Sequence, residues 1–166
     1  MSVFTRENLL YFVKEALWMA ITALLITAVL YPITSKLDFI YWKMNSFFIF
    51  IAITYFRWSV TFRSLPFLRP AAIRFILFAG NLSLFIYIMY NLQKFIGLAD
   101  NFYIEDFGFP KVIIFEDVKR EMFDYLYKEL VFFGTAALVM LSAFQVRLII
   151  SYWQYYKHAS SRMLED

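Results

Sequence analysis

Hydrophobic residues in this chain fall into four blocks, and almost all charged residues lie between the blocks. Each block approaches the ~20 residues that an α-helix needs to cross ~30 Å of hydrocarbon. Residues 75–92 and 130–146 contain no charged side chain, whereas a helix of a soluble bundle carries charges along its solvent face. The pattern therefore predicts an all-α integral membrane protein that folds as a bundle of four transmembrane helices.

The predicted spans and connections make residues 1–166 a single membrane domain. The spans cover about 16–33, 39–58, 73–92 and 130–150. The two longer connections are 57–74, where Pro66 and Pro70 interrupt the helix, and 93–128, which is acidic.

The last helix is expected to begin well before its span. From about Asp117 the pattern turns helical, because Val118, Met122 and Leu126 fall on one face and Asp124 and Lys128 form a favourable i,i+4 pair. We predict one long helix that extends from the membrane into the acidic connection. Residues 111–115 ahead of it are expected to form a short strand or an interfacial segment.

Lysine and arginine in the loops set the orientation, because cytoplasmic loops carry an excess of these residues. The N-terminal segment, the 57–74 connection and the C-terminal tail hold nine basic and four acidic residues, whereas the opposite side holds seven basic and nine acidic residues. Both termini and the 57–74 connection are therefore predicted to be cytoplasmic, and the 93–128 connection periplasmic.

The first block does not resemble a cleaved signal peptide. It lacks a short apolar core followed by a small-residue cleavage site, and Glu7 and Glu15 lie where a leader would be basic. We expect this helix to be retained. Because organellar transit features are missing, we place the protein in the bacterial inner (plasma) membrane, with the mitochondrial inner membrane as the alternative.

Composition narrows the possible chemistry. Hydrophobic residues make up 62% of the chain and charged residues 17%, and the chain has no cysteine and one histidine, His158. Thiolate zinc sites, iron–sulfur clusters and a bis-histidine haem held by this chain alone are therefore excluded. With no glycine-rich phosphate loop or catalytic motif, we expect no catalytic, cofactor or metal site, no enzymatic activity and no nucleic-acid partner.

Two groups of side chains outside the spans are candidates for lipid or partner contact. Arginine forks suit the phosphates of anionic headgroups on the cytoplasmic side, although such charge also serves topology alone. Aromatic side chains on a loop dip into the membrane interface or bury against a partner. The arginines are Arg57, Arg63, Arg69 and Arg74, and the aromatic residues are Phe102, Tyr103, Phe107 and Phe109.

Uncharged polar residues in the third and fourth spans are the intramembrane candidates: Asn81, Ser83, Ser142 and Gln145. They either bond helices together or line a polar conduction path. No Asp, Glu, Lys or His is expected near mid-membrane, which weighs against an active ion transporter acting alone.

Small residues at helical spacing suggest a close helix–helix contact on the first helix: Ala16, Ala20, Ala23 and Thr27. Such a face lets helices approach closely, and we expect it to pack within the bundle.

These features favour a non-catalytic accessory or structural subunit of a larger inner-membrane complex, whose helices and aromatic loop pack against other integral membrane subunits. The alternative is a homo-oligomeric channel or small transporter with a polar path through the third and fourth spans. A lipid-modifying membrane enzyme is the weakest interpretation, because no nucleophile or metal set is evident.

Overall fold

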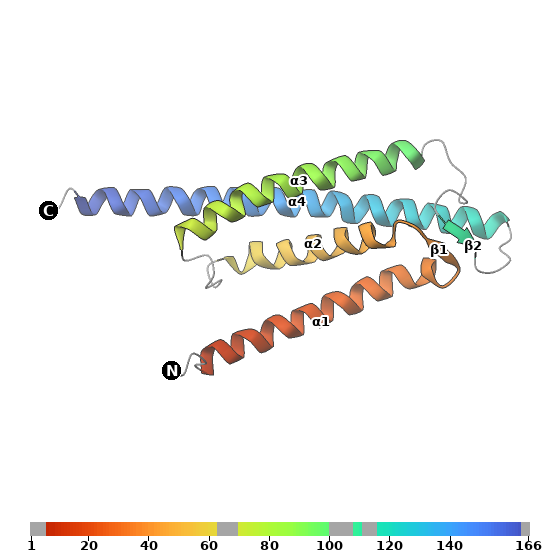
Figure 1. Ribbon diagram of the computed structural model, residues 1–166, viewed down its shortest axis with the longest axis horizontal. Coiled ribbons are helices and arrows are strands. Elements are labelled where there is room, and N and C mark those ends of the chain that lie inside the picture. Colours follow the sequence, from red (N-terminus) through yellow and green to blue (C-terminus); the bar gives the residue numbers. More distant parts are fainter. Residues whose placement is uncertain (1–5, 63–69, 100–107, 111–115, 164–166) are drawn as a thin grey trace.

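The computed structural model describes residues 6–62, 70–99, 108–110 and 116–163. This part of the chain contains helices α1 (Arg6–Thr34), α2 (Trp42–Val60), α3 (Ala71–Ala99) and α4 (Glu116–Met163) and two three-residue strands, β1 (Leu37–Phe39) and β2 (Gly108–Pro110). The all-α class predicted from the sequence is confirmed. As Figure 1 shows, α1 begins and α4 ends at the same end of the molecule.

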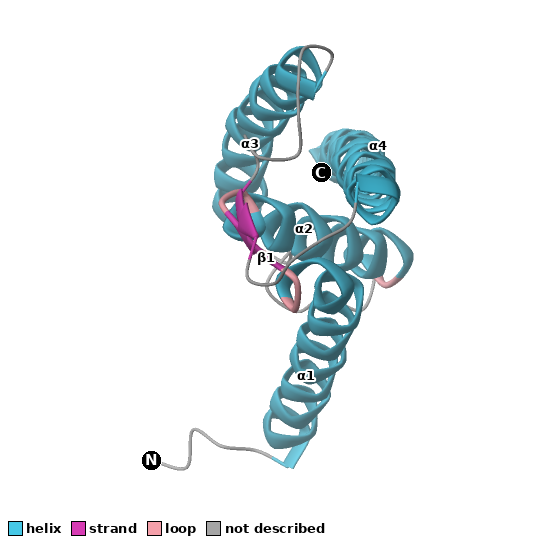
Figure 2. Cartoon of the chain, turned by 90° about the vertical axis from the view of Figure 1, so that its right-hand side faces the viewer, coloured by secondary structure: helices cyan, strands magenta, loops and turns pink. Residues whose placement is uncertain are grey.

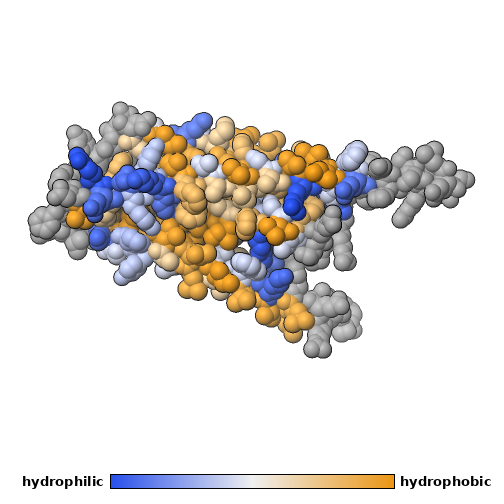
Figure 3. Space-filling model, turned by 180° about the vertical axis from the view of Figure 1, so that it is seen from behind, coloured by the Kyte–Doolittle hydropathy of each residue, from blue (hydrophilic) through white to orange (hydrophobic). Residues whose placement is uncertain are grey.

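Three helices are long and apolar enough to cross a membrane, so the protein is a multi-pass membrane protein. The candidate spans are Phe12–Thr34, Ala72–Ala99 and Arg120–Gln154. On the face seen in Figure 3, hydrophobic side chains cover much of the middle of the molecule, and most hydrophilic side chains lie nearer its two ends. This distribution matches a hydrocarbon slab bounded by two polar interfaces.

Helices α2 and α4 lie together at the centre of the packing. Helix α2 packs against both α1 and α4, while α3 packs against α4. Its inner face buries Phe48, Ile51 and Tyr55, and the Tyr55 ring meets the edge of the Phe144 ring from α4 at 5.2 Å between centroids. The core therefore lies mainly between α2 and α4.

Gly134 of α4 lies close to side chains of both α2 and α3. A Cβ atom at this position would lie 2.8 Å from Cδ1 of Leu92 on α3 and 3.2 Å from Cδ2 of Phe48 on α2. Interiors packed to crystal-like density leave no room for such an atom unless a neighbour moves. A glycine on α4 therefore allows these three helices to meet.

Helix α1 stands apart from the remaining helices. It converges with α2 near β1 and diverges toward its own N-terminus (Figure 1), and in the end view it projects away from the other three helices (Figure 2). Buried α1 residues are concentrated in its C-terminal part, at Thr22, Leu30 and Ile33, whereas residues such as Leu10 and Leu17 are about 60% exposed. The buried side chains of this helix therefore lie mainly in its C-terminal half.

The structure changes the boundaries predicted for the second and third spans. β1 pairs antiparallel with β2, with Asp38 opposite Phe109. Residues 39–41 therefore precede α2 rather than belonging to the second span. Helix α3 continues to Ala99, so the first part of the predicted 93–128 loop is helical. The segment 111–115 lies outside the described residues.

The expected long last helix is present, because α4 runs for 48 residues without interruption. Its predicted inner face is confirmed, since Met122 and Leu126 are buried. Lys128 and Asp124 form the expected i,i+4 ion pair at 2.5 Å on the outer face. The amphipathic spacing of the residues before the apolar stretch therefore predicted the first part of this helix correctly.

Candidate functional site

Arg57 forms an ion pair between α2 and α1. Its Nη2 atom donates to Oε2 of Glu15 at 2.5 Å, and the side chains are 12% and 28% exposed, respectively. The guanidinium also lies over the Trp18 ring, 5.9 Å from its centroid, which favours a cation–π interaction. The Arg57 side chain therefore makes its contacts within the chain, and Glu15 compensates its charge.

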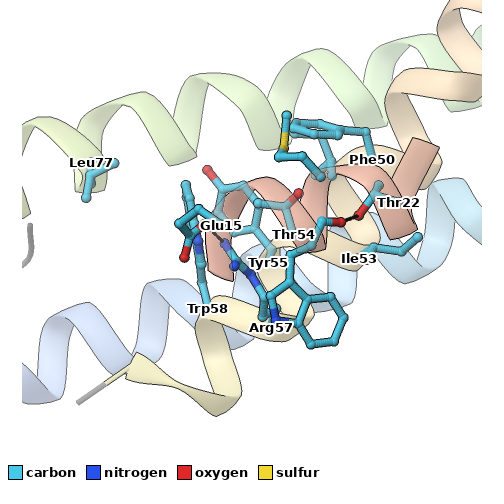
Figure 4. A pocket seen from close by; sticks show the side chains of 12 residues that line it. Glu15, Thr22, Phe50, Ile53, Thr54, Tyr55, Arg57, Trp58 and Leu77 are labelled. Carbon is cyan, nitrogen blue, oxygen red and sulfur yellow. Dashed lines mark hydrogen bonds and ion pairs between the residues drawn. The ribbon is translucent and has the colours of Figure 1, made fainter. Parts of the chain in front are cut away.

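The same ion pair borders a cavity of about 290 Å³ between α1 and α2, with Leu77 of α3 at its edge. Figure 4 shows Glu15 and Arg57 beside Tyr55 and Trp58 at this cavity. The rest of the lining is mostly apolar. The cavity can therefore accept an apolar group next to a neutralised ion pair.

In the described part of the structure, the predicted arginines do not form one cluster. Arg74 Nη1 donates to the Ser151 hydroxyl at 3.1 Å and to the Ser151 carbonyl at 3.4 Å, so it joins the start of α3 to the far part of α4. Arg63 and Arg69 lie outside the described residues. The two described arginines each hold a pair of helices together at the same end of the molecule.

Asn81 and Gln145 form a polar link between α3 and α4. Asn81 Nδ2 donates to Gln145 Oε1 at 2.6 Å and to the Leu141 carbonyl at 3.1 Å, and Gln145 Nε2 donates to the Phe78 carbonyl at 3.3 Å. This arrangement matches the interpretation of these residues as a bond between helices.

The two serines behave differently from this pair. Ser83 donates to the Ala79 carbonyl at 3.3 Å and Ser142 to the Leu138 carbonyl at 2.9 Å; both are exposed. Each hydroxyl is thereby satisfied within its own helix and can face lipid. Ser142 also lines a second cavity of about 290 Å³ that contains Asn81 and Gln145, whereas Ser83 is not part of that lining.

The predicted aromatic contact group lies largely beyond the described residues. Phe102, Tyr103 and Phe107 are outside them, and for Phe109 the structure describes the backbone position in β2. The register places Phe109 opposite Asp38. The partner contact predicted for this group stays a prediction.

One polar pair was missed from the sequence. Glu129, one of the nine acidic residues counted above on the side opposite the predicted cytoplasmic side, is 8% exposed. It lies in the α2–α4 interface, where fully buried Asn45 donates from Nδ2 to its Oε2 atom. The helical spacing of α4 could have indicated this burial, because Glu129 follows Met122 and Leu126 on the same face of the helix. Glu129 lies one residue before the predicted span 130–150, so its charge was assigned to the connection and its burial was not predicted.

Comparisons with known proteins give no family for this chain. A scan against protein-family models, a search of characterised proteins and a search of solved structures find no match. The functional conclusion therefore depends on the geometry of the helices themselves.

Proposed function

We propose that this protein is a non-catalytic accessory subunit of a larger inner-membrane complex, and that α1 is the helix that docks against a partner subunit. The observation that carries the proposal is the outward position of the small-residue stripe on α1. Its members, all exposed, are Ala16, Ala20, Ala23 and Thr27.

Small residues in a membrane helix favour contact with another helix because they allow two backbones to approach closely. In the described part of the chain the stripe is exposed, while α1 packs on α2 and β1 through buried residues such as Thr22 and Ile33 on another side of the helix. Leu30, which continues the line of the stripe toward the end of α1, is buried as well. Large residues fill lipid-facing surface equally well, so lipid alone gives no reason for the stripe. A transmembrane helix of another subunit would use it.

The membrane topology belongs to the same proposal. Helices α1 and α3 run in the same direction, so α2 carries the chain back between them (Figure 1). With 19 residues, α2 is ~28 Å long, which suits a fourth span shielded by its neighbours. The positive-inside rule then puts both termini and the 57–74 connection in the cytoplasm.

Arginines of the 57–74 connection would contact anionic headgroups in this orientation. Arg57 is compensated by Glu15 and contributes to helix packing, so this role falls mainly to Arg63 and Arg69. The predicted aromatic loop would form a second partner contact on the periplasmic side.

The test is a stepwise enlargement of the stripe in the full chain, followed by purification in a mild detergent or nanodiscs from the native host. Ala20→Leu and Ala23→Leu should each reduce the amount of co-purifying membrane subunit at least fivefold while leaving expression and thermal stability unchanged. Mass spectrometry of the unmodified protein identifies the subunit.

Ala28→Leu is the matched control, because Ala28 is also exposed on α1 but lies about 110° around the helix from the stripe. It should leave the partner in place. A clean homo-oligomer with no stoichiometric partner would refute the accessory-subunit role, and equal loss from all three variants would refute the stripe as its docking face.

The second candidate function is a homo-oligomeric channel, which the cavity lined by Asn81, Ser142 and Gln145 favours. The direct bond between Asn81 and Gln145 instead favours a structural role. Flux through proteoliposomes decides between them: Asn81→Ala and Gln145→Ala would change conductance in a channel, whereas a structural link would change stability alone.

A further inference from the structure

Glu129 presents an unusual chemical situation in the α2–α4 interface. It lies in the candidate membrane helix Arg120–Gln154, directly before the uncharged residues 130–146, and between two fully buried side chains of the same helix, Leu126 and Leu130. A carboxylate in such surroundings is stable only with a counter-charge or a set of hydrogen-bond donors.

The bond from Asn45 supplies one donor and leaves two acceptors unused. Asn45 Nδ2 donates to Glu129 Oε2, while Glu129 Oε1 and Asn45 Oδ1 are buried and have no hydrogen-bond partner. Both of these atoms are oxygens, and both require a donor. One additional hydrogen placed between the two groups would satisfy both of them.

No cation whose side chain the structure describes supplies the missing charge. Lys128 turns outward and pairs with Asp124 at 2.5 Å, and Tyr125, one turn before Glu129, donates its hydroxyl to the Val29 carbonyl at 3.0 Å. Among the charged residues at this end of the helices whose side chains the structure describes, six others are exposed: Lys36, Asp38, Lys43, Lys94, Arg120 and Glu121.

We propose that Glu129 is a buried proton-binding site, in which the neutral carboxylic acid and the Asn45 amide form a cyclic pair with two hydrogen bonds. The amide N–H donates to Oε2, as observed, and the acid O–H on Oε1 donates to Asn45 Oδ1. One proton from water is taken up, and no other bond forms or breaks. Loss of this proton would leave a buried carboxylate and weaken the contact between α2 and α4.

The proposal is independent of the accessory-subunit function and gives this interface a sensitivity to pH. The direction of this pH dependence follows from the protonation of Glu129 in the folded and in the unfolded chain. Folded Glu129 holds its proton, while in the unfolded chain it ionises like an ordinary glutamate, near pH 4.3. The stabilisation of the folded state by protonated Glu129 is therefore complete at acidic pH and is lost as pH rises. For one proton, the folding equilibrium constant falls by up to about tenfold per pH unit.

Infrared spectroscopy of the purified full chain at neutral pH tests the site directly. The protein should show the carbonyl absorption of a protonated carboxylic acid, and Glu129→Gln should remove it. Asp124→Asn, a change at the exposed carboxylate one turn away and on the outer face, should leave it in place. Asn45→Ala should keep the absorption and shift it to higher frequency, because the acid O–H loses its acceptor.

Denaturant unfolding between pH 5 and pH 8 supplies the second measurement. The unmodified protein should lose stability with rising pH more steeply than Glu129→Gln, whose amide can form both hydrogen bonds with Asn45 without a proton. Absence of the acid absorption at neutral pH would overturn the proposal. Stabilisation of the unmodified protein by added Na⁺ but not of Glu129→Gln would also overturn it, in favour of a cation at the same oxygens.

Discussion

Two glutamates in this protein each join a pair of helices, and their surroundings differ in charge. Glu15 on α1 pairs with a guanidinium and keeps 28% of its side chain exposed. Glu129 on α4 meets an uncharged amide and is 8% exposed. The first pair lies at the open edge of the bundle, and the second lies inside its core.

The two pairs show how burial changes the contribution of a polar contact to the free energy of unfolding. A partly exposed ion pair gains little, because water screens both charges and competes for them. A buried polar pair is expensive to disrupt, because each group left behind has no water to replace its partner. The following predictions test this difference, beginning with a disruption of the core around the buried pair.

Gly134→Leu should produce the largest loss of stability. A side chain here would collide with Leu92 and Phe48, and overpacking of this kind costs ~1–3 kcal/mol or more. Thermal unfolding in detergent measures the loss. Gly80→Leu is the control, because a Cβ at Gly80 meets nothing within 4 Å; equal destabilisation by both changes would contradict the helix convergence described above.

Asn45→Ala should rank second, with a loss of ~1–3 kcal/mol, because it removes the hydrogen-bond partner of Glu129 and leaves that carboxyl group buried and unpaired. Denaturant titration of the purified protein gives the value. Ser46→Ala is a neighbouring control, since Ser46 bonds to the Trp42 carbonyl of its own helix. An Asn45→Ala variant as stable as the Ser46→Ala variant would show that the buried pair contributes nothing.

Asn81→Ala should have a moderate effect, ~0.6–2 kcal/mol, because interhelical hydrogen bonds within membranes are worth about this much. The change removes the donors to Gln145 and to the Leu141 carbonyl. Ser83→Ala should be close to neutral, since the Ser83 hydroxyl bonds within α3. Unfolding of the two variants side by side distinguishes a link between helices from a general loss of polarity.

Glu15→Gln should have the smallest measurable effect of the set, ~0.2–1 kcal/mol, because the ion pair with Arg57 is partly exposed. The loss should shrink as salt is raised, since screening already weakens the pair. Asp124→Asn, which removes an exposed i,i+4 pair with Lys128, should change stability less still. A loss from Glu15→Gln larger than that from Asn45→Ala would reverse the comparison.

The sequence by itself determined the elements that depend on local composition. Apolar runs of membrane-crossing length define α1, α3 and α4, because hydrocarbon requires every backbone polar group to be satisfied within a helix. The spacing of Met122 and Leu126 likewise predicted that α4 begins long before its span. Such features need no knowledge of neighbouring helices.

Tertiary structure alone decided which residues meet. The partners Asn45 and Glu129 are 84 positions apart, so no local pattern pairs them, and a charged residue at the edge of an apolar run reads as a loop residue. The outward position of the α1 stripe was equally hidden, because small residues have the same sequence pattern whether they face their own bundle or another subunit. Side-chain burial is set by packing between distant segments, and the chemistry of Glu129 follows from that burial.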